Sequence, residues 1–428
     1  MKFKQLTLIG LPALALGLLI GNLLWNPSMW AFFDPAYWKG LGKVGESMRL
    51  IHFRYVDEEE ASFENLSETA VSELVNNLDK HSRYMSLDDF KDFDLSSKRQ
   101  YYGIGVAIYK SDDRIMITRV FPGGGAESAG VRAGDRILAV ESTRIVDATS
   151  AEVSALIRGA AGTEISLLLE DENNSSREIQ VTRGKVQLAS VDAVRMIDDI
   201  GYLRIDQFIE RTGQEFDEAM AYLNRQGMQY LVIDLRGNAG GRLDAAVNVL
   251  GHFFNQDEEV VSIAGRSRAG NTYLSSGKGQ SAVPMVVLIN EGSASSSEIV
   301  AGALQVTNKA KLVGESSYGK GSVQTIFSMD DGSGMRLTTA RYFLPGKIPI
   351  GEDGLVPDLK VVCDQDTWEK LLLQRDQDPF ANAELFEKRF GFAPVKDFQL
   401  EMALRLLRGE PIDPVEETNL PQEVSPDP

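Results

Sequence analysis

Two nearly uninterrupted apolar runs constrain the fold of this 428-residue chain more than any other feature. YLVIDL (230–235) and MVVLIN (285–290) lack the polar alternation of a strand that faces water on one side. Such runs are typical of parallel strands that are covered on both faces. Strand-like and helix-like segments alternate around them, in the order GYLRIDQF, EFDEAMAYLNRQ, YLVIDLRG, RLDAAVNVLGHF, MVVLIN, EIVAGALQ and KLVGE. This order predicts an α/β core over residues 186–365.

A β-rich region precedes this core. Its short runs GIGVAIYK, RIMITRVF, DRILAV, EISLLLE and REIQVTR are separated by Gly, Asp and Asn turn signals. Among them, a short helix and a turn are expected at AESAGVRAGD (126–135), and an amphipathic helix at SAEVSALIRGA (150–160). These runs predict a compact β-domain from Tyr101 onward, and the length of the chain, which exceeds what one hydrophobic core supports, predicts two or three domains.

The two ends of the chain differ from these regions in composition and in predicted structure. Lys2 and Lys4 precede an almost uncharged apolar run from Leu6 to Trp25, which is typical of a signal peptide or of an uncleaved membrane anchor over residues 1–25. Either alternative predicts export to a periplasmic or extracytoplasmic location, and a retained segment would anchor the chain to the inner membrane. Residues 26–95 are predicted to form a helical packing or dimerisation module, and residues 366–410 are helical again. The acidic, Pro-rich tail 411–428 is expected to be disordered.

Charge and rare residue types exclude several functions. A net charge of −18 opposes nucleic-acid binding, which requires a basic surface. The single cysteine, Cys363, cannot form an intramolecular disulfide or a cysteine-based metal site. The three histidines, His52, His81 and His252, show no zinc-ligand spacing. We therefore expect no metal, no cofactor and no nucleic acid, and a Ser-His hydrolase would have to recruit one of these histidines.

The segment LINEGSASSSEIVAGAL (288–304) carries the first candidate for chemistry, because a buried strand ends there in a Gly-Ser turn and a helix begins. A hydroxyl at a helix N-terminus faces unpaired N–H groups and the positive end of the helix dipole, which favour a developing oxyanion. Ser295 and Glu298 also fit an S-x-x-E capping box, a common structural device. Four serines occur here, at positions 293, 295, 296 and 297. These residues alone leave open which serine is nucleophilic and whether Ser295 is only a cap.

The segment KLVGESSYGKGSVQ (311–324) places Lys320 between Gly319 and Gly321. The glycines permit a close backbone approach that directs the lysine inward, whereas the alternative is a solvated turn lysine. A lysine that accepts a serine proton must be neutral, so its pKa must fall from about 10.4 to roughly 7 to 8. Burial in an apolar pocket with no carboxylate beside the ammonium has this effect. Gln324 offers a neutral amide that can orient the amine.

A third segment, IDLRGNAGGRLDAA (233–246), runs from a buried strand through a Gly-rich turn into a helix. The backbone N–H groups of Gly240 and Gly241, with that of Ser296, are expected to bind an oxyanion. The alternatives are a phosphate-binding turn or an ordinary tight connection, although no G-x-G-x-x-G or Walker pattern is present.

These three segments, with the β-domain before them, resemble the C-terminal processing peptidases, or tail-specific proteases, which are Ser-Lys enzymes with a PDZ domain. In that family the nucleophile is the middle serine of S-A-S-x-S-E, and the base lysine follows 25 residues later in G-K-G-x-V-Q, a spacing that Ser295 and Lys320 share. The resemblance implies that Ser295 is the nucleophile, Lys320 the general base and Gln324 the residue that orients the lysine. It also implies an oxyanion hole formed by the N–H groups of Gly241 and Ser296.

The same resemblance implies a multidomain α+β fold. A PDZ domain over residues 96–185 would be inserted between the N-terminal helical region and an α/β core of the crotonase/ClpP-like type, with C-terminal helices after it. LDKHSRYM (78–85) and GEDGLVPD (351–358) match further family elements. Two positions depart from the pattern: Ser296 replaces an alanine, and RGNAGG replaces R-N-N-P-G-G, which leaves the contact glycine in question.

The function implied is that of an exported serine endopeptidase that captures the free C-terminal tails of protein substrates. In the loop GIGVAI, the N–H groups of Gly105 and Val106 are expected to bind the terminal carboxylate, and Ile108 to line an apolar pocket. A homo-oligomer is expected, with control by the PDZ domain, an adaptor or another regulator. The alternatives are a proteolytically silent PDZ scaffold and a peptide-binding chaperone.

Overall fold

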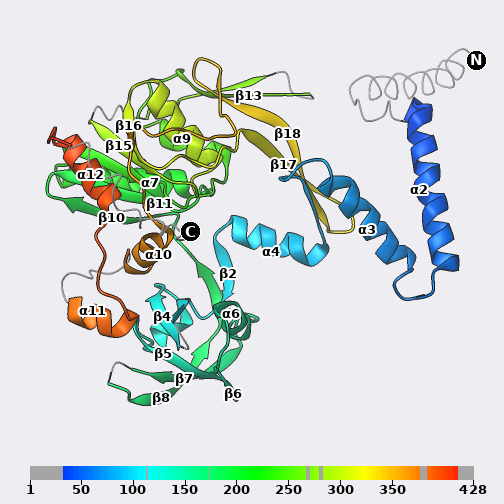
Figure 1. The fold of residues 1–428 in the computed structure, drawn as a ribbon, viewed down its shortest axis with the longest axis horizontal. Helices are drawn as coiled ribbons and strands as arrows, with labels where there is room; N and C mark the ends of the chain where they lie inside the picture. The colour runs from blue at the N-terminus through cyan, green and yellow to red at the C-terminus, as the bar shows by residue number, and fades with distance from the viewer. Residues whose placement is uncertain are drawn as a thin grey trace, which may run out of the picture. The chain divides into compact units, whose positions relative to one another are not determined.

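The computed structural model describes residues 32–111, 114–171, 173–266, 270–278, 283–375 and 383–412. The predicted signal or anchor segment 1–25, and residues 413–428 of the tail, lie outside the described residues. Within the described ranges, no helix has the length and apolar character needed to cross a membrane. The chain divides by its internal contacts into two units, Met1–Ser86 with Phe327–Leu337 and Leu87–Ile326 with Thr338–Pro428 (Figure 1).

The larger unit contains the predicted α/β core. Its main sheet has the order β10-β11-β12-β15-β16-β20, in which β10 is antiparallel to β11 and every other neighbouring pair is parallel. The strands are β10 Val191–Ile197, β11 Ile200–Ile205, β12 Tyr230–Asp234, β15 Met285–Ile289, β16 Ala310–Gly314 and β20 Leu359–Lys360. The helices between them are α7 Thr212–Arg225, α8 Leu243–Leu250 and α9 Ser296–Val306. The predicted alternation of strands and helices is confirmed.

Helices cover both faces of this sheet, which explains its continuous apolar strands. On β12, Leu231 and Ile233 belong to the core that also contains the buried residues of α7, α8 and α9. Val232, between them, belongs to a second core that includes Ala403 of α12 (Phe398–Leu407). Figure 1 shows α9 and α12 beside the same strands. Because neither face meets water, polar alternation along β12 and β15 would cost burial energy.

The parallel register of β12 and β15 brings two segments of the sequence together. Asp234 pairs with Leu288, so both strands end at the same edge of the sheet. The chain leaves that edge through loops 235–242 and 290–295, which lead into α8 and α9. Ligands and reacting groups in open α/β sheets gather at such strand ends, where the N-termini of the following helices point.

A second sheet of the larger unit is antiparallel. It contains β13 Glu259–Gly265, β14 Asn271–Leu274 and the part of β18 (Gly334–Leu344) from residue 338 onward, and β17 (Ser322–Ser328) also pairs with β18. The predicted C-terminal helices are present as α10 Gln365–Gln374, α11 Ala383–Phe390 and α12.

The β-rich region folds as predicted. Its main sheet has the order β3-β4-β5-β7-β8, with β6 beside β5, and β2 pairs with β9. The strands are β2 Gln100–Gly103, β3 Val106–Ser111, β4 Arg114–Val120, β5 Arg136–Val140, β6 Thr143–Arg144, β7 Glu164–Glu170, β8 Ser176–Thr182 and β9 Gly184–Gln187. The two expected helices are α5 Gly125–Ser128 and α6 Ser150–Ile157, and α6 begins at a Thr149–Glu152 capping box. This domain has its own buried core, separate from that of the α/β sheet.

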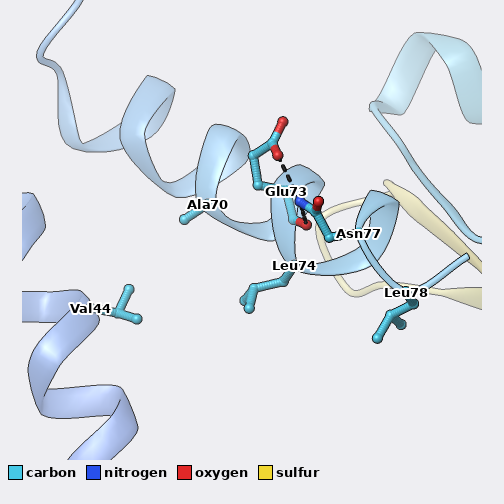
Figure 2. A pocket seen from close by; sticks show the side chains of 6 residues that line it. All are labelled: Val44, Ala70, Glu73, Leu74, Asn77 and Leu78. Carbon is cyan, nitrogen blue, oxygen red and sulfur yellow. Dashed lines mark hydrogen bonds between the residues drawn. The ribbon is translucent and has the colours of Figure 1, made fainter.

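The predicted N-terminal helices are α2 Pro35–Arg54, α3 Phe63–Asn76 and α4 Leu87–Ser97; α4 lies in the larger unit. In the smaller unit, β1 (Arg83–Met85) pairs with the first residues of β18. Helix α2 buries none of its residues, and Leu74 of α3 is 66% exposed. An open groove of about 420 Å³ lies between α2 and α3 and is mainly apolar (Figure 2). It is lined by Val44, Ala70, Glu73, Leu74, Asn77 and Leu78.

Candidate active site

Ser295 occupies a strained turn between β15 and α9. Its backbone angles, φ 55° and ψ −113°, lie outside the regions that L-residues favour. Such a residue persists only where its surroundings hold it in place, and strained residues cluster at functional sites. The strand–turn–helix arrangement is also the one that presents the nucleophilic serine of α/β hydrolases. Ser295 is almost fully buried, with 7% of its surface exposed.

The neighbouring serines have structural partners in loop 235–242. Their hydroxyls donate to three backbone carbonyls there: Ser293 to Leu235 O at 2.9 Å, Ser296 to Gly241 O at 3.0 Å and Ser297 to Asn238 O at 2.7 Å. The Ser295 hydroxyl is not among these cross-links. Three of the four serines therefore bind loop 235–242 to the serine turn and to the start of α9. This geometry favours Ser295 as the reactive serine.

Gly240 packs directly against the serine turn, and Gly241 against Phe208, which follows β11. A Cβ on Gly240 (φ +97°) would lie 2.6 Å from Ala294 O, and one on Gly241 (φ +142°) 2.0 Å from Phe208 O. Both positions therefore require glycine. The N–H of Gly240 donates to Asn238 Oδ1 at 2.9 Å, whereas that of Gly241 has no acceptor among the described residues. This difference favours Gly241, the predicted residue, as the donor to an oxyanion.

Glu298 joins the serine turn to the lysine loop. This carboxylate is fully buried, and each of its oxygens accepts two hydrogen bonds. Oε1 accepts from Ser317 Oγ at 2.6 Å and from Gly319 N at 2.7 Å, and Oε2 accepts from Ser295 N at 2.7 Å and from Lys320 N at 2.8 Å. Because Ser295 N and Lys320 N share one oxygen atom, they cannot lie farther apart than the sum of those two bonds.

The lysine loop packs tightly against residues 350–354. A Cβ on Gly319 (φ +85°) would lie 2.1 Å from Glu352 O, and one on Gly321 would lie 2.5 Å from Ile350 O. The close backbone approach predicted for the two glycines is confirmed, and Lys320 between them is half-buried. The sequence predicted a pocket without a carboxylate beside the ammonium. A buried carboxylate, that of Glu298, does lie at this loop, where it accepts from the backbone N–H groups of Gly319 and Lys320.

Gln324 and Tyr342 belong to β17 and β18, two paired strands that follow the lysine loop in the sequence. Gln324 of β17 donates from Nε2 to Ser322 Oγ at 2.9 Å and to Thr338 Oγ1 at 3.2 Å. Tyr342 of β18 is 5% exposed, and its backbone N–H donates to Gly321 O at 2.8 Å, one residue after Lys320. Burial raises the pKa of Tyr342 to about 12, so its phenol is neutral at pH 7. Sequence reasoning missed Tyr342, because no motif marks this position.

A buried ionic cluster supports the Gly-rich loop. Arg236 donates to Asp234 and to Asp397, the N-cap of α12, through bonds that include Nη2 to Asp234 Oδ2 at 2.7 Å and Nη2 to Asp397 Oδ2 at 2.8 Å. Burial by itself would raise the pKa of Asp234, but the Arg236 guanidinium outweighs it and holds this pKa below its usual range. The cluster therefore ties α12 to the start of loop 235–242.

The residues predicted to bind a peptide tail lie together at the start of β3. Gly105 has φ +85°, and a Cβ there would lie 2.9 Å from Gly124 Cα. Val106 begins β3, and Ile108 pairs with Ile117 of β4. Helix α6 packs against β3. This strand and helix are the elements that border a PDZ groove.

Two of the three histidines have side-chain partners away from Ser295. Nε2 of His252 lies 2.6 Å from Asp217 Oδ1, and Nδ1 of His52 lies 2.8 Å from Ala61 O. Asp217 also pairs with Lys278, so this group links the end of α8 to α7 and to the segment after β14. Nothing in these contacts supports a Ser-His arrangement with Ser295.

Glu298→Gln is expected to damage both stability and activity. The amide presents only one acceptor oxygen, so its NH₂ group would face two buried donors that now bind Glu298. We expect a loss of about 2 to 4 kcal/mol in the free energy of unfolding and a fall in kcat of about 100-fold. Urea unfolding and steady-state kinetics measure both effects. Glu291→Gln, at an exposed position of the same serine loop, is the matched control and should change neither; equal behaviour of the two variants would contradict this role of Glu298.

Comparison with family models gives the chain two matches. The model of peptidase family S41 matches residues 199–361, which contain β11 to β20, and the PDZ domain model matches residues 92–170. The predicted architecture is thereby confirmed, with a PDZ domain between an N-terminal helical region and an S41 protease core that C-terminal helices follow.

Individual proteins show the same relationship. The carboxy-terminal-processing protease of Bartonella bacilliformis is 33% identical over 396 residues, which cover 87% of this chain and 89% of that protein. The carboxy-terminal processing protease CtpB of Bacillus subtilis is 31% identical over 76% of this chain and 68% of its own length. A solved S41 protease structure from Bacteroides fragilis has a similar fold, with a TM-score of 0.53 at 18% identity over 85% of this chain and 96% of that one. The chain is therefore a serine-type peptidase with a PDZ domain, and it belongs to the carboxy-terminal processing proteases of peptidase family S41.

Proposed function

We propose that this protein is an exported endopeptidase that cleaves protein substrates through Ser295 and Lys320, after its PDZ domain has bound their free C-terminal tails. The observation that carries the proposal is the shared oxygen of Glu298. Glu298 Oε2 accepts from the backbone N–H of Ser295 at 2.7 Å and from that of Lys320 at 2.8 Å. The two backbones therefore lie close together, although the residues come from different loops.

The reaction would be an acyl transfer in two steps. Ser295 Oγ attacks the scissile carbonyl carbon and forms a C–O bond, while its proton passes to the neutral amine of Lys320. The carbonyl electron pair moves to oxygen, which the N–H groups of Gly241 and Ser296 bind. The intermediate then breaks its C–N bond, and the leaving amine takes the proton from Lys320. Water attacks the ester in the second step, with Lys320 again taking and returning a proton.

Three arrangements support these roles. The N–H of Gly241 is unused by the described residues, and α9 begins at Ser296 with its N–H groups toward the turn. Gln324 donates its amide hydrogens to Ser322 and Thr338, and we assign its carbonyl oxygen to the Lys320 amine. An amide acceptor orients the amine without adding a negative charge, which would otherwise favour the protonated form.

Tail capture would use the strand edge of β3. The N–H groups of Gly105 and Val106 would bind the terminal carboxylate, and Ile108 would line the pocket for the last apolar side chain. Ion pairs connect this domain to the protease sheet: Arg119 of β4 lies 3.4 Å from Asp192 of β10, which also pairs with Arg204 of β11 at 2.9 Å. These contacts offer a physical route by which an occupied groove would influence the catalytic sheet.

The test is cleavage of an unfolded substrate protein that ends in an apolar tail. The full chain should cut internal peptide bonds, and mass spectrometry should identify the fragments. The same substrate with an amidated C-terminus should have a KM about tenfold or more higher, because the groove then loses its carboxylate ligand. Bound but uncleaved substrate would overturn the proposal in favour of a silent scaffold or a peptide-binding chaperone.

We extend the proposal to the location and assembly of the protein. The apolar run from Leu6 to Trp25 supports export to the periplasm, and fractionation of cells should recover the chain with the membrane if this segment is retained. The exposed apolar side chains of α2 and α3 support a homo-oligomer, because such surfaces are usually covered by a partner. Leu74→Glu should lower the mass seen in sedimentation if α3 lies in that interface; an unchanged mass would exclude it.

A further inference from the structure

We propose that Asn238 is the positioning residue of the oxyanion hole, because its side chain fixes the Gly-rich loop so that the N–H of Gly241 stays directed at the reacting carbonyl oxygen. The inference rests on the proposed function, in which Gly241 and Ser296 bind the oxyanion. Asn238 is 0% exposed and acts through Gly241 without touching the substrate itself.

The Asn238 side chain bridges two buried backbone groups. Its Nδ2 donates to the carbonyl oxygen of Ile205, the last residue of β11, at 2.7 Å, and its Oδ1 accepts from the N–H of Gly240 at 2.9 Å. These partners fix the orientation of the amide, because the Ile205 carbonyl can only accept and the Gly240 N–H can only donate. Gly240 is therefore tied to the end of a buried strand.

The direction of the Gly241 N–H follows from the peptide group that it shares with Gly240. The carbonyl oxygen of Gly240 accepts from the N–H of Phe208 at 3.0 Å, and this peptide bond is trans. In a planar trans peptide the C=O and the N–H point in opposite directions, so the Gly241 N–H points away from Phe208. The Gly240 N–H is already bound to Asn238, which leaves Gly241 as the donor for the oxyanion.

Two successive glycines make such an anchor necessary. Gly240 and Gly241 have φ values of +97° and +142°, and glycine has more alternative conformations than any other residue. A rotation of the peptide between them would replace the N–H with a carbonyl oxygen, which repels an oxyanion. The bond from Asn238 holds the preceding peptide group in place, so that the carbonyl of Gly240 stays bound to Phe208.

Asn238 also positions this loop relative to Ser295. Its backbone carbonyl accepts from Ala294 N at 3.0 Å and from Ser297 Oγ at 2.7 Å, one residue before and two residues after Ser295. A Cβ added to Gly240 would lie 2.9 Å from Ser295 Cβ, so the loop is in contact with the nucleophile. One buried residue therefore relates the oxyanion donor to the attacking group, and small errors in such geometry cost rate.

The test compares Asn238→Ala with Asn238→Ser in the full chain. Alanine removes both side-chain bonds, whereas a serine hydroxyl can still accept from the N–H of Gly240, two residues later. For Asn238→Ala we expect kcat per folded molecule to fall about 100-fold with KM within about threefold, because the oxyanion forms only in the transition state. Asn238→Ser should lose only about three- to tenfold in kcat, since Gly240 keeps an acceptor but loses its tie to Ile205.

A peptide aldehyde gives a readout that a loss of stability alone would not change. Ser295 Oγ bonds to the aldehyde carbon, and the carbonyl electron pair moves to the oxygen, which then lies in the oxyanion hole. The dissociation constant of the aldehyde should rise by the same factor as kcat/KM falls, in both variants.

Gln374→Ala is the matched control, because its buried side-chain amide also bridges two backbone groups, the N–H and the C=O of Val395. This variant should unfold at a lower temperature, since it leaves buried backbone groups without their partner. Its kcat per folded molecule and its affinity for the aldehyde should stay within about twofold of the wild type. Circular dichroism gives the folded fraction of each variant.

The outcomes separate this inference from the proposed function. Wild-type kcat per folded molecule in Asn238→Ala, or a lower kcat with unchanged aldehyde binding, would overturn the role of Asn238 alone. An active Ser295→Ala would overturn both. If Asn238→Ala does not fold, Asn238→Ser decides: a fall in kcat/KM of about threefold or more, with an equal rise in the aldehyde dissociation constant, supports the role, and wild-type values of both contradict it.

Discussion

Ser295→Ala is expected to lower kcat by about 10⁴-fold or more while leaving the free energy of unfolding within about 1 kcal/mol. The alanine lacks the oxygen that forms the acyl-enzyme, and no other serine of the turn can replace it. Ser293, Ser296 and Ser297 each bind a carbonyl of loop 235–242. Peptide cleavage under substrate saturation and urea unfolding are the two measurements.

Ser297→Ala is the matched control for this prediction, because it removes a hydroxyl two positions away, in the first turn of α9. Ser297 donates to Asn238 O at 2.7 Å inside the protein, so its loss leaves a buried carbonyl without that donor. We expect a loss of about 1 to 3 kcal/mol in stability and kcat within about tenfold of the wild type. The reverse pattern, with Ser297→Ala inactive and Ser295→Ala active, would show that Ser295 is not the nucleophile.

Lys320→Ala and Lys320→Arg are both expected to lower kcat by about 10³-fold or more. Alanine has no base, and the arginine guanidinium remains protonated at any pH that the fold withstands, so neither accepts the Ser295 proton. The loop itself should keep its geometry, because Glu298 binds the backbone N–H of Lys320 rather than its side chain. Steady-state kinetics of both variants, with thermal unfolding to confirm the fold, measures this effect.

Chemical rescue gives the sharper form of the same experiment. Lys320→Cys alkylated with 2-bromoethylamine carries an amine at nearly the position of the lysine amine and should recover at least about a tenth of wild-type kcat. The wild-type enzyme treated in the same way controls for alkylation of Cys363, which is half-buried. Failure of the amine to restore any activity, or an active Lys320→Arg variant, would show that Lys320 is not the base.

The local sequence pattern was sufficient to predict the main strands and helices of this protein. YLVIDL and MVVLIN predicted buried parallel strands, and they are β12 and β15. The two short helices of the β-domain were also predicted, because caps and turn residues act within a few positions. The pattern was less informative for the N-terminal helices. Leu74 and Leu78 have helical spacing, yet both are about two-thirds exposed, since periodicity does not say whether a partner covers the apolar face.

The sequence likewise predicted some residues of the candidate site and missed the contacts of others. The S-A-S-x-S-E and G-K-G-x-V-Q motifs directed attention to Ser295 and Lys320, and the glycines beside Lys320 predicted a close approach that the structure shows. Glu298 was recognised only as a helix cap. Its bonds to Gly319 and Lys320 depend on a loop that lies more than twenty residues away in the sequence, and spacing carries no signal for such a contact.

By itself, the sequence determined which segments become strands, helices and tight turns, because propensity, apolar period and glycine requirements are local properties of the chain. Only the tertiary structure decided which serine stays outside the cross-links to loop 235–242, and which carboxylate holds the segments of Ser295 and Lys320 together. These contacts arise from the parallel register of β12, β15 and β16, whose following loops leave the same edge of the sheet. The physical reason is that hydrogen bonds depend on distances of about 3 Å between atoms that chain folding brings together, whatever their separation in sequence.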